Sequence, residues 1–394
     1  MLKKTSNLKP SVHGTYISDI KNNFDKKFFD QVVEVLQTDK YFNNYSDVSL
    51  KKEIISSFKN INLQNFIQIN ESTKSAKFNL TFQEISWLKK RSKKIWGKYL
   101  IYRYKFKVLP QKYIAGDFPP YVLIEPTSIC NLRCIMCFQI DTSFTSDKEM
   151  MGKMDLELFK NIIDEAHKNG TKAITLASRG EPTLHPDLPK MLEYCSGKFF
   201  ELKINTNATR LNEELIHDIL KSGVTDVVFS VDSYQKQDYE KIRVRGIFET
   251  VVENIKKFKE IKDEYYPNSI CATRISGVRV DKQFDSVKFK EFWEKYVDHV
   301  VVVEMENRWD TYHNSLDIGA EEPCEYLWER MYLWFDGICN PCDADYKSEL
   351  ALGNVKNTPI KEIWHGEKYT NLRNLHLEKK RRNCYPCDRC PIGS

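Results

Sequence analysis

The sequence has no long apolar run: nowhere do about 18 apolar residues follow one another, which argues against a transmembrane helix. Its start, MLKKTSNLKPSVHG, lacks the apolar segment of a secretory signal, so we expect a cytoplasmic protein. Charge of one sign is not in large excess either, since the net charge is only +5. Overall charge therefore predicts no particular partner, and nothing in it is firm evidence for a nucleic acid. There is no solenoid-type repeat and no low-complexity segment.

The chain has 11 cysteines, an odd number, and they cluster in twos and threes. Such clusters are typical of metal binding in a reducing compartment and not of a disulfide framework. A length of 394 residues with 41% hydrophobic residues is ample for two or three domains. We predict a helical extension over residues 1–116, an α/β domain over 117–306 and a small cysteine-rich domain over 307–394.

The helical extension carries no chemical motif, but it ends in a basic stretch from Lys89 to Lys107. The pattern predicts one helix over residues 85–102, with an apolar face and positive charge around the rest. Aromatic side chains among the lysines would suit contact with a membrane surface, a phosphorylated substrate or RNA. The simpler interpretation is a helix that packs on the next domain and exposes a solvated basic face.

The α/β domain alternates strand and helix six times. This alternation implies right-handed crossovers and a parallel sheet with helices outside it. Six units are too few for a closed eight-stranded barrel, so the predicted fold is an open, partial (β/α)6 TIM-like barrel. The predicted strands are 121–127, 172–178, 200–205, 226–232, 270–280 and 299–306, and the predicted helices are 155–169, 188–195, 212–222, 248–261 and 284–296.

Three cysteines, Cys130, Cys134 and Cys137, stand in the run SICNLRCIMCF. Their spacing lets one loop hold an iron–sulfur cluster while one iron keeps no protein ligand. A substrate or cosubstrate can then bind that iron directly. The rival metal is zinc, held by these three cysteines and a distant fourth.

Polar residues gather where the predicted strands end. Ligands of parallel α/β proteins bind at the carboxyl ends of the strands, so these residues should share one rim with the cysteine loop. Some of them also suit helix caps or turns when taken alone. The residues are Glu125, Thr127, Ser178, Arg179, Gly180, Glu181, Pro182, Asn205, Thr206, Asn207, Ser230, Asp232, Ser233, Arg274, Ser276, Glu304, Glu306 and Asn307.

The cysteine loop and the following Gly-Glu-Pro together resemble those of radical S-adenosylmethionine (SAM) enzymes. In that family the open iron of a [4Fe–4S] cluster binds the amino and carboxylate groups of SAM. The resemblance implies that Gly180, Glu181 and Pro182 meet the methionine amino group, that Ser230 and Asp232 face the ribose or carboxylate, and that Asn207 and Arg274 give supporting polar contacts.

Two positions depart from the family pattern. Met136, followed by Cys137 and Phe138, stands where an aromatic residue often precedes the third cysteine. Arg179 stands where a second glycine is usual. The implied chemistry is reductive cleavage of SAM to a 5′-deoxyadenosyl radical, which abstracts hydrogen from an unactivated C–H bond. An electron donor such as flavodoxin or ferredoxin would supply the electron.

Six more cysteines lie beyond residue 323. On spacing alone they would suit a zinc ribbon. The runs MYLWFDGICNPCDAD and CYPCDRCP resemble instead the SPASM or shorter "twitch" extension of radical SAM enzymes, which holds auxiliary clusters. The resemblance implies one auxiliary [4Fe–4S] cluster on Cys324, Cys342, Cys387 and Cys390, with Cys384 and Cys339 as alternates.

A second cluster near the substrate can accept an electron, which favours an oxidation. We therefore predict an oxidoreductase that acts on a carbohydrate or other small-molecule alcohol. A peptide-modifying maturase is the alternative, and a non-catalytic iron–sulfur sensor or zinc-ribbon protein is the non-enzyme alternative. An RNA-modifying enzyme is a further one. No general acid or base is identified, and the candidates are Arg179, Glu304, Glu306, Tyr332 and Asp336.

Overall fold

The computed structural model describes residues 16–22, 24–71, 78–281, 283–305 and 310–392. Glu306 and Asn307 of the predicted rim lie outside these ranges. None of the helices described is long and apolar enough to cross a membrane.

One sheet of nine strands organises the chain, in the order β11-β10-β9-β1-β3-β4-β5-β7-β8. The six predicted strands are present and pair in parallel. They are β1 (Tyr121–Ile124), β3 (Ala173–Leu176), β4 (Glu201–Thr206), β5 (Asp226–Ser230), β7 (Ala272–Arg279) and β8 (His299–Glu304). Since β8 and β11 form the two ends of this order, the sheet stays open, and the predicted fold class is confirmed.

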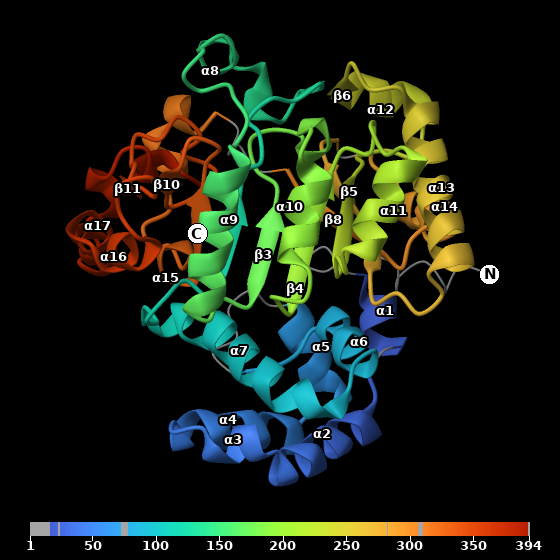
Figure 1. Cartoon of the computed structure of the whole chain (residues 1–394), viewed down its shortest axis with the longest axis vertical. Helices are drawn as coiled ribbons and strands as arrows, with labels where there is room; N and C mark the ends of the chain where they lie inside the picture. The colour runs from blue at the N-terminus through green and yellow to red at the C-terminus, as the bar shows by residue number, and fades with distance from the viewer. Residues whose placement is uncertain (1–15, 23, 72–77, 282, 306–309, 393–394) are drawn as a thin grey trace.

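The crossover helices cover the outer face of the sheet (Figure 1). They are α9 (Leu156–Lys168), α10 (Leu188–Cys195), α11 (Glu213–Lys221), α13 (Phe248–Tyr265) and α14 (Ser286–Trp293). Each buries an apolar stripe against the strands, in a core that includes Phe159, Leu192, Ile216, Phe258 and Trp293. Short elements lie at the opposite end from the N-terminal helices: α8 (Thr142–Thr145), α12 (Lys236–Ile242), β2 (Arg133–Cys134) and β6 (Arg243–Val244).

The C-terminal part extends the sheet, which the sequence did not predict. Strand β9 (Arg330–Leu333) runs parallel to β1, and β10 (Ile338–Asn340) and β11 (Gly353–Asn354) follow as antiparallel strands. Three helices complete this part: α15 (Tyr326–Glu329), α16 (Ile360–His365) and α17 (Glu367–Leu377). Buried Met331, Leu333 and Trp364 belong to the same core as β1 and α9, so this part packs against the barrel as one body.

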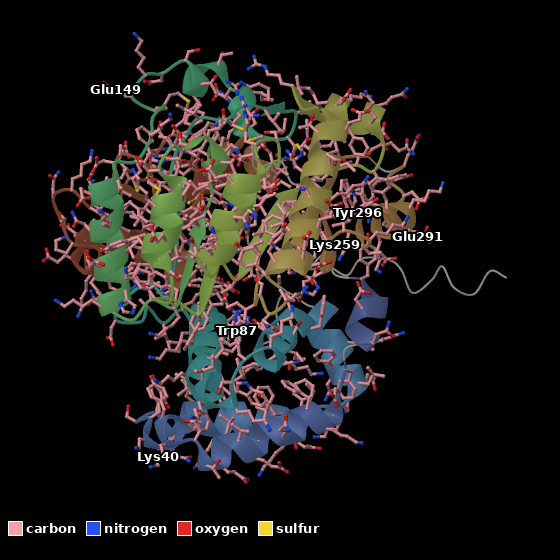
Figure 2. The ribbon with its side chains drawn as sticks, turned by 45° about the vertical axis from the view of Figure 1, so that its right-hand side comes forward. Lys40, Trp87, Glu149, Lys259, Glu291 and Tyr296 are labelled. Carbon is pink, nitrogen blue, oxygen red and sulfur yellow. The ribbon has the colours of Figure 1, made fainter. Side chains whose placement is uncertain are left out.

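The N-terminal part is helical, as predicted, and packs on the amino-terminal end of the sheet (Figure 1). Trp87 lies where the N-terminal helices meet the barrel (Figure 2). Its indole ring stacks on the Tyr99 ring with the centroids 3.8 Å apart, and its N–H donates to the carbonyl of Phe200. The helices are α1 (Ile17–Asn22), α2 (Lys26–Thr38), α3 (Lys40–Asn44), α4 (Val48–Lys59), α5 (Leu63–Glu71), α6 (Phe82–Lys89) and α7 (Trp96–Val108).

The single helix predicted over residues 85–102 was wrong, because the chain forms α6 and α7 with a break between them. The indole N–H of Trp96, the first residue of α7, donates to the carbonyl of Leu88 near the end of α6. Much of the predicted basic face is exposed to solvent, since Lys90, Lys93, Lys94 and Lys98 are exposed, whereas Lys89 pairs with Asp25 and Lys107 pairs with buried Glu84. Contact with a membrane through this stretch stays a prediction.

Candidate active site

A cavity of about 570 Å³ opens at the carboxyl ends of the strands, where the polar rim was predicted. The cysteine loop, the ends of β3, β4 and β5, strand β8 and the C-terminal part all contribute to its wall. The predicted site residues that line it are Cys130, Cys134, Cys137, Gly180, Glu181, Asn207 and Ser230. Pro182, Asp232 and Arg274 do not line it.

The three cysteines of the loop face this cavity together. Cys134 lies in β2, which pairs with β6, so the loop is anchored to a second segment of the chain. Burial, followed by the nearby Glu181 carboxylate, raises the pKa of the Cys130 thiol to about 12. A bound iron–sulfur cluster would reverse this effect, because a metal deprotonates the thiols that coordinate it.

Gly180 lets the Gly-Glu-Pro segment lie directly against the cysteine loop. A Cβ atom at this position would lie 2.2 Å from the Thr127 carbonyl oxygen, so no larger residue fits without moving the backbone. The next residue donates its backbone N–H to the Ile129 carbonyl at 2.9 Å. Pro182 follows as the first residue of a short 3₁₀ turn and is not among the residues that line the cavity.

Both carboxylate oxygens of Glu181 are held by hydrogen bonds. One accepts from the hydroxyls of Thr206 at 2.6 Å and Thr183 at 2.7 Å, and the other accepts from the backbone N–H of Asn207 at 2.7 Å. Burial raises the pKa of this carboxyl, and the hydrogen bonds oppose that effect. Asn207 also donates to Asn131 at 3.0 Å, which ties the end of β4 to the cysteine loop.

Asp232 does not face the cavity, which corrects the role expected from its position. Its carboxylate accepts from Arg243 Nε at 2.7 Å and from the Val278 N–H at 2.8 Å. The guanidinium of Arg243 lies in the cavity, and its Nη1 approaches Cys134 Sγ at 3.9 Å. Asp232 therefore positions Arg243, which carries positive charge to the cysteine site. The sequence gives no signal for Arg243, since it belongs to no motif.

Three buried polar atoms in the cavity wall have no hydrogen-bond partner among the residues described. They are the Ser178 hydroxyl and the side-chain carbonyls of Asn205 and Gln139. Buried polar groups in native proteins are almost always paired, so a polar ligand is expected here. Amino and hydroxyl groups of SAM would satisfy them, and three thiols beside them suit a cluster with an open iron. The residues present fit both groups.

Arg274 lies at the other end of the sheet, so the predicted contact with SAM is not supported. It lines a separate cavity of about 530 Å³ near the amino-terminal ends of the strands. The reason is register: Arg274 is the third residue of the eight in β7, whereas Val278, four residues later, lines the active-site cavity.

The four C-terminal cysteines that the resemblance singles out lie close to one another. Burial, followed by the neighbouring Cys387 and Cys390, raises the pKa of the Cys342 thiol. Burial also raises the pKa of the Cys387 thiol, and the neighbouring Cys324 adds to this increase. A set of four cysteine sulfurs is the usual protein environment of a [4Fe–4S] cluster. This set therefore fits an auxiliary cluster.

The two alternate ligands, Cys339 and Cys384, have different surroundings from these four cysteines. Cys339 is in β10 with its side chain in the core, and the ionisable group that affects its pKa, after burial, is Glu165. Cys384 donates to the Lys380 carbonyl, although it is near Cys387. Buried Arg381 holds the final loop by donating to the carbonyls of Cys387, Glu322, Cys390 and Ile392. Across the described ranges, no three side chains of the metal-binding types meet closely enough to hold a single metal ion.

Among the candidate acids and bases, Glu304 and Arg179 line the active-site cavity. Tyr332 and Asp336 do not: Tyr332 packs in the core beneath the N-terminal helices, and Asp336 accepts from the backbone of Ile338 in a turn. Glu306 lies outside the described residues. Asp343 and Tyr326, which were not predicted as site residues, bring the C-terminal part to the cavity wall. The position of Asp343 directly after Cys342 is the signal that could have identified it.

Models of known families match two stretches of the chain. The radical SAM superfamily matches residues 124–280, and the iron–sulfur cluster-binding SPASM domain matches residues 324–391. The chain is also 35% identical over 319 residues to the "tungsten-containing aldehyde ferredoxin oxidoreductase cofactor-modifying protein" of Pyrococcus furiosus, covering 68% of this chain and 86% of that protein. This protein belongs to the radical SAM superfamily.

Two further proteins are similar to this radical SAM enzyme. It is 28% identical over 318 residues to the "antilisterial bacteriocin subtilosin biosynthesis protein AlbA" of Bacillus subtilis, covering 71% of this chain and 67% of that one. Its fold is similar to that of Streptococcus suis SuiB bound to precursor peptide SuiA, with a TM-score of 0.57 and 15% identity. That similarity covers 95% of this chain and 91% of SuiB.

The predicted family and cofactors are confirmed by these matches. A radical SAM domain binds a [4Fe–4S] cluster and SAM, and a SPASM domain binds further iron–sulfur clusters. The non-enzyme alternatives are not supported, because the matched relatives are enzymes. The individual site residues stay predictions that rest on the geometry described above.

Proposed function

We propose that this radical SAM enzyme modifies a peptide, abstracting hydrogen from one of its residues. The observation that carries the proposal is the fold similarity to SuiB, a protein seen with a precursor peptide, over 95% of this chain. The similarity extends through the N-terminal part, whose role the sequence left open. The relationship to a bacteriocin biosynthesis protein supports the same substrate class.

The predicted oxidation of a carbohydrate or other small-molecule alcohol is less well supported than this alternative. The oxidation was inferred from the second cluster as an electron acceptor, and an alcohol was preferred to a peptide only because residues 1–116 lack the strand-rich start of a peptide-recognition domain. The active-site cavity is lined by the α/β domain and by the C-terminal part.

When bound, the cluster and SAM supply a 5′-deoxyadenosyl radical that can abstract hydrogen from a C–H bond. The protein's residues have the remaining tasks. Glu181, fixed by its hydrogen bonds, positions a carboxylate next to the cysteine loop, and Arg243 adds a positive charge beside Cys134. A substrate that loses two hydrogens gives up one hydrogen atom, one electron and one proton. A cluster held by the C-terminal cysteines would accept the electron, and we assign the base that accepts the proton to Asp343 in the cavity wall beside Cys342.

The test uses anaerobically reconstituted protein with dithionite and SAM. A cell extract is divided by size into a peptide fraction and a small-metabolite fraction, and each is offered as substrate. We expect 5′-deoxyadenosine release with a loss of two hydrogen masses from a molecule of the peptide fraction. The variant with Cys130, Cys134 and Cys137 all replaced by Ala should give neither product. Modification confined to the metabolite fraction would contradict the peptide assignment.

Modification of an enzyme cofactor is a second candidate function. The relative from Pyrococcus furiosus, which carries the name of a cofactor-modifying protein, is 35% identical over most of its length. The same experiment separates the two, because a cofactor would be modified in the small-metabolite fraction.

A further inference from the structure

A groove of about 340 Å³ lies between the N-terminal helices and the amino-terminal end of the sheet. We call it the lysine groove and define it by Tyr41, Tyr45, Lys98, Lys105 and Lys172. Helices α3 and α7 form one side, and the turn between α9 and β3 forms the other (Figure 1). Since Lys172 directly precedes β3, the groove is at the opposite end of that strand from the active-site cavity.

Three ammonium groups meet in this groove. Lys98 and Lys105 are seven residues apart on α7, two turns of helix, so they project from the same face. Among the residues described, none of the three lysine side chains has an ion pair or a hydrogen bond, and the acidic residue in the groove wall is Asp117. Burial, followed by the charges of Lys98 and Lys105, lowers the pKa of Lys172. Positive charges that lie close together, without as many negative charges beside them, favour the binding of an anion.

The aromatic residues hold two of these charges at the mouth of the groove. The ammonium of Lys98 lies 5.1 Å from the ring centroid of Tyr41, and that of Lys105 lies 5.2 Å from the ring of Tyr45. Such cation–π contacts stabilise a cation without neutralising its charge. The lysines are therefore ordered and still available to an anion.

The inner wall of the groove is apolar. It is made by side chains from both parts of the molecule, namely Ile101, Leu109, Phe118 and Trp328. A small-molecule site is typically a concave apolar surface of a few hundred cubic ångströms with a few charged groups that orient the ligand. The lysine groove has this composition, with lysines on both of its sides and aromatic and aliphatic side chains along its inner wall.

We propose that the lysine groove binds a small anion that carries a ring, of the nucleoside phosphate class. Three ammonium groups match the two or three negative charges of a phosphate ester or diphosphate, and the apolar wall accommodates a ring. The site is separate from the active-site cavity, so its ligand acts on the junction between the N-terminal helices and the barrel and does not take part in the chemistry. This proposal does not depend on the peptide substrate.

The test is calorimetric titration of the full-length, cluster-reconstituted protein with ADP, in the presence of saturating SAM. SAM occupies the active-site cavity and keeps ADP from binding there. We expect saturable binding that weakens as salt is added, because charge pairs at a surface are screened. Lys172→Gln should weaken the binding about tenfold, and Lys98→Gln with Lys105→Gln should weaken it further.

Lys94→Gln is the matched control, since Lys94 is exposed, lies just before α7 and is not part of the groove. It removes the same charge and should leave the affinity for ADP unchanged. The melting temperature of each variant shows whether it is folded. Equal weakening by Lys94→Gln, no ADP binding at all, or binding of an oligoglutamate peptide in preference to ADP would each overturn the proposal.

Discussion

Arg179 and Glu125 form a buried, bidentate ion pair at the point where β1 and β3 end. Arg179 Nε and Nη2 each lie 2.7 Å from a different carboxylate oxygen of Glu125. Arg179 also donates to the Tyr346 carbonyl at 2.9 Å, and Glu125 accepts from the Phe335 N–H at 3.3 Å. The arginine that replaces a usual family glycine thus joins the radical SAM barrel to the C-terminal domain, and this accounts for a residue that the motif left unexplained.

Removing one partner of this pair should destabilise the protein strongly. Arg179→Met leaves the Glu125 carboxylate buried without its counter-charge, so we expect the free energy of unfolding to fall by about 3–5 kcal/mol. The double variant Glu125→Gln with Arg179→Met buries no net charge and should recover a large part of that loss. Urea unfolding followed by tryptophan fluorescence measures both, with Arg210→Met at an exposed position as the control. A double variant as unstable as the sum of the two single variants would contradict this account.

Gly180→Ala should empty the first cluster site without unfolding the protein. The new methyl group would meet the Thr127 carbonyl at 2.2 Å, so the cysteine loop or the Gly-Glu-Pro segment must shift. We expect loss of the visible absorbance of that cluster and of 5′-deoxyadenosine formation. Gly116→Ala is the matched control, because the nearest atom to its Cβ is 3.6 Å away, an ordinary contact. Full cluster content in Gly180→Ala would show that the loop tolerates the shift.

The fold was predictable where the sequence is strongly periodic. Helix α10 (Leu188–Cys195) has the predicted bounds, and the six parallel strands lie within a few residues of theirs. The apolar runs of buried strands and the regular spacing of turns are local signals, so one sequence contains them. The break between α6 and α7 was not predictable in this way, because it depends on the indole of Trp96 reaching a carbonyl eight residues earlier.

The candidate site was predictable at its motifs and not beyond them. The cysteines and Gly180-Glu181 carry spacing signals, and the structure brings them to one cavity. Arg243 reaches that cavity from β6 only because β6 pairs with β2, a tertiary contact with no sequence signature. Arg274 was misplaced for a different reason: it is the fifth of eleven residues in the predicted strand 270–280 and the third of eight in β7, so both sets of bounds put it in the amino-terminal half of the strand, away from the rim.

The auxiliary cluster can be tested by counting iron. Cys342→Ala removes one of the four neighbouring thiols, and we expect the iron content to fall from two clusters per chain to one. Cys339→Ala is the matched control, since Cys339 is buried in β10 away from that set and its loss should leave the iron content unchanged. Zinc in place of the second cluster's iron would favour the ribbon, and equal iron loss in both variants would show that Cys339 is a ligand.

His299 should make the stability of the protein depend on pH. It begins β8, packs edge-on against Phe82 at 5.2 Å, and its pKa is lowered from 6.5 to about 4, mainly by burial. A lowered pKa means that the folded protein binds fewer protons than the unfolded chain between these values. Stability from this group is therefore complete above pH 6.5 and is lost as the pH falls towards 4. The shift corresponds to a loss of up to about 3 kcal/mol.

His299→Gln removes the titrating group, so the free energy of unfolding should depend less steeply on pH across this window. Urea unfolding of the cluster-free protein at a series of pH values measures the slope. His365→Gln removes an exposed imidazole and should leave the slope as it is in the native protein. A slope that His299→Gln does not change would mean that this side chain is already charged in the folded state, which would place water, and not protein, around it at the junction of the N-terminal helices with the barrel.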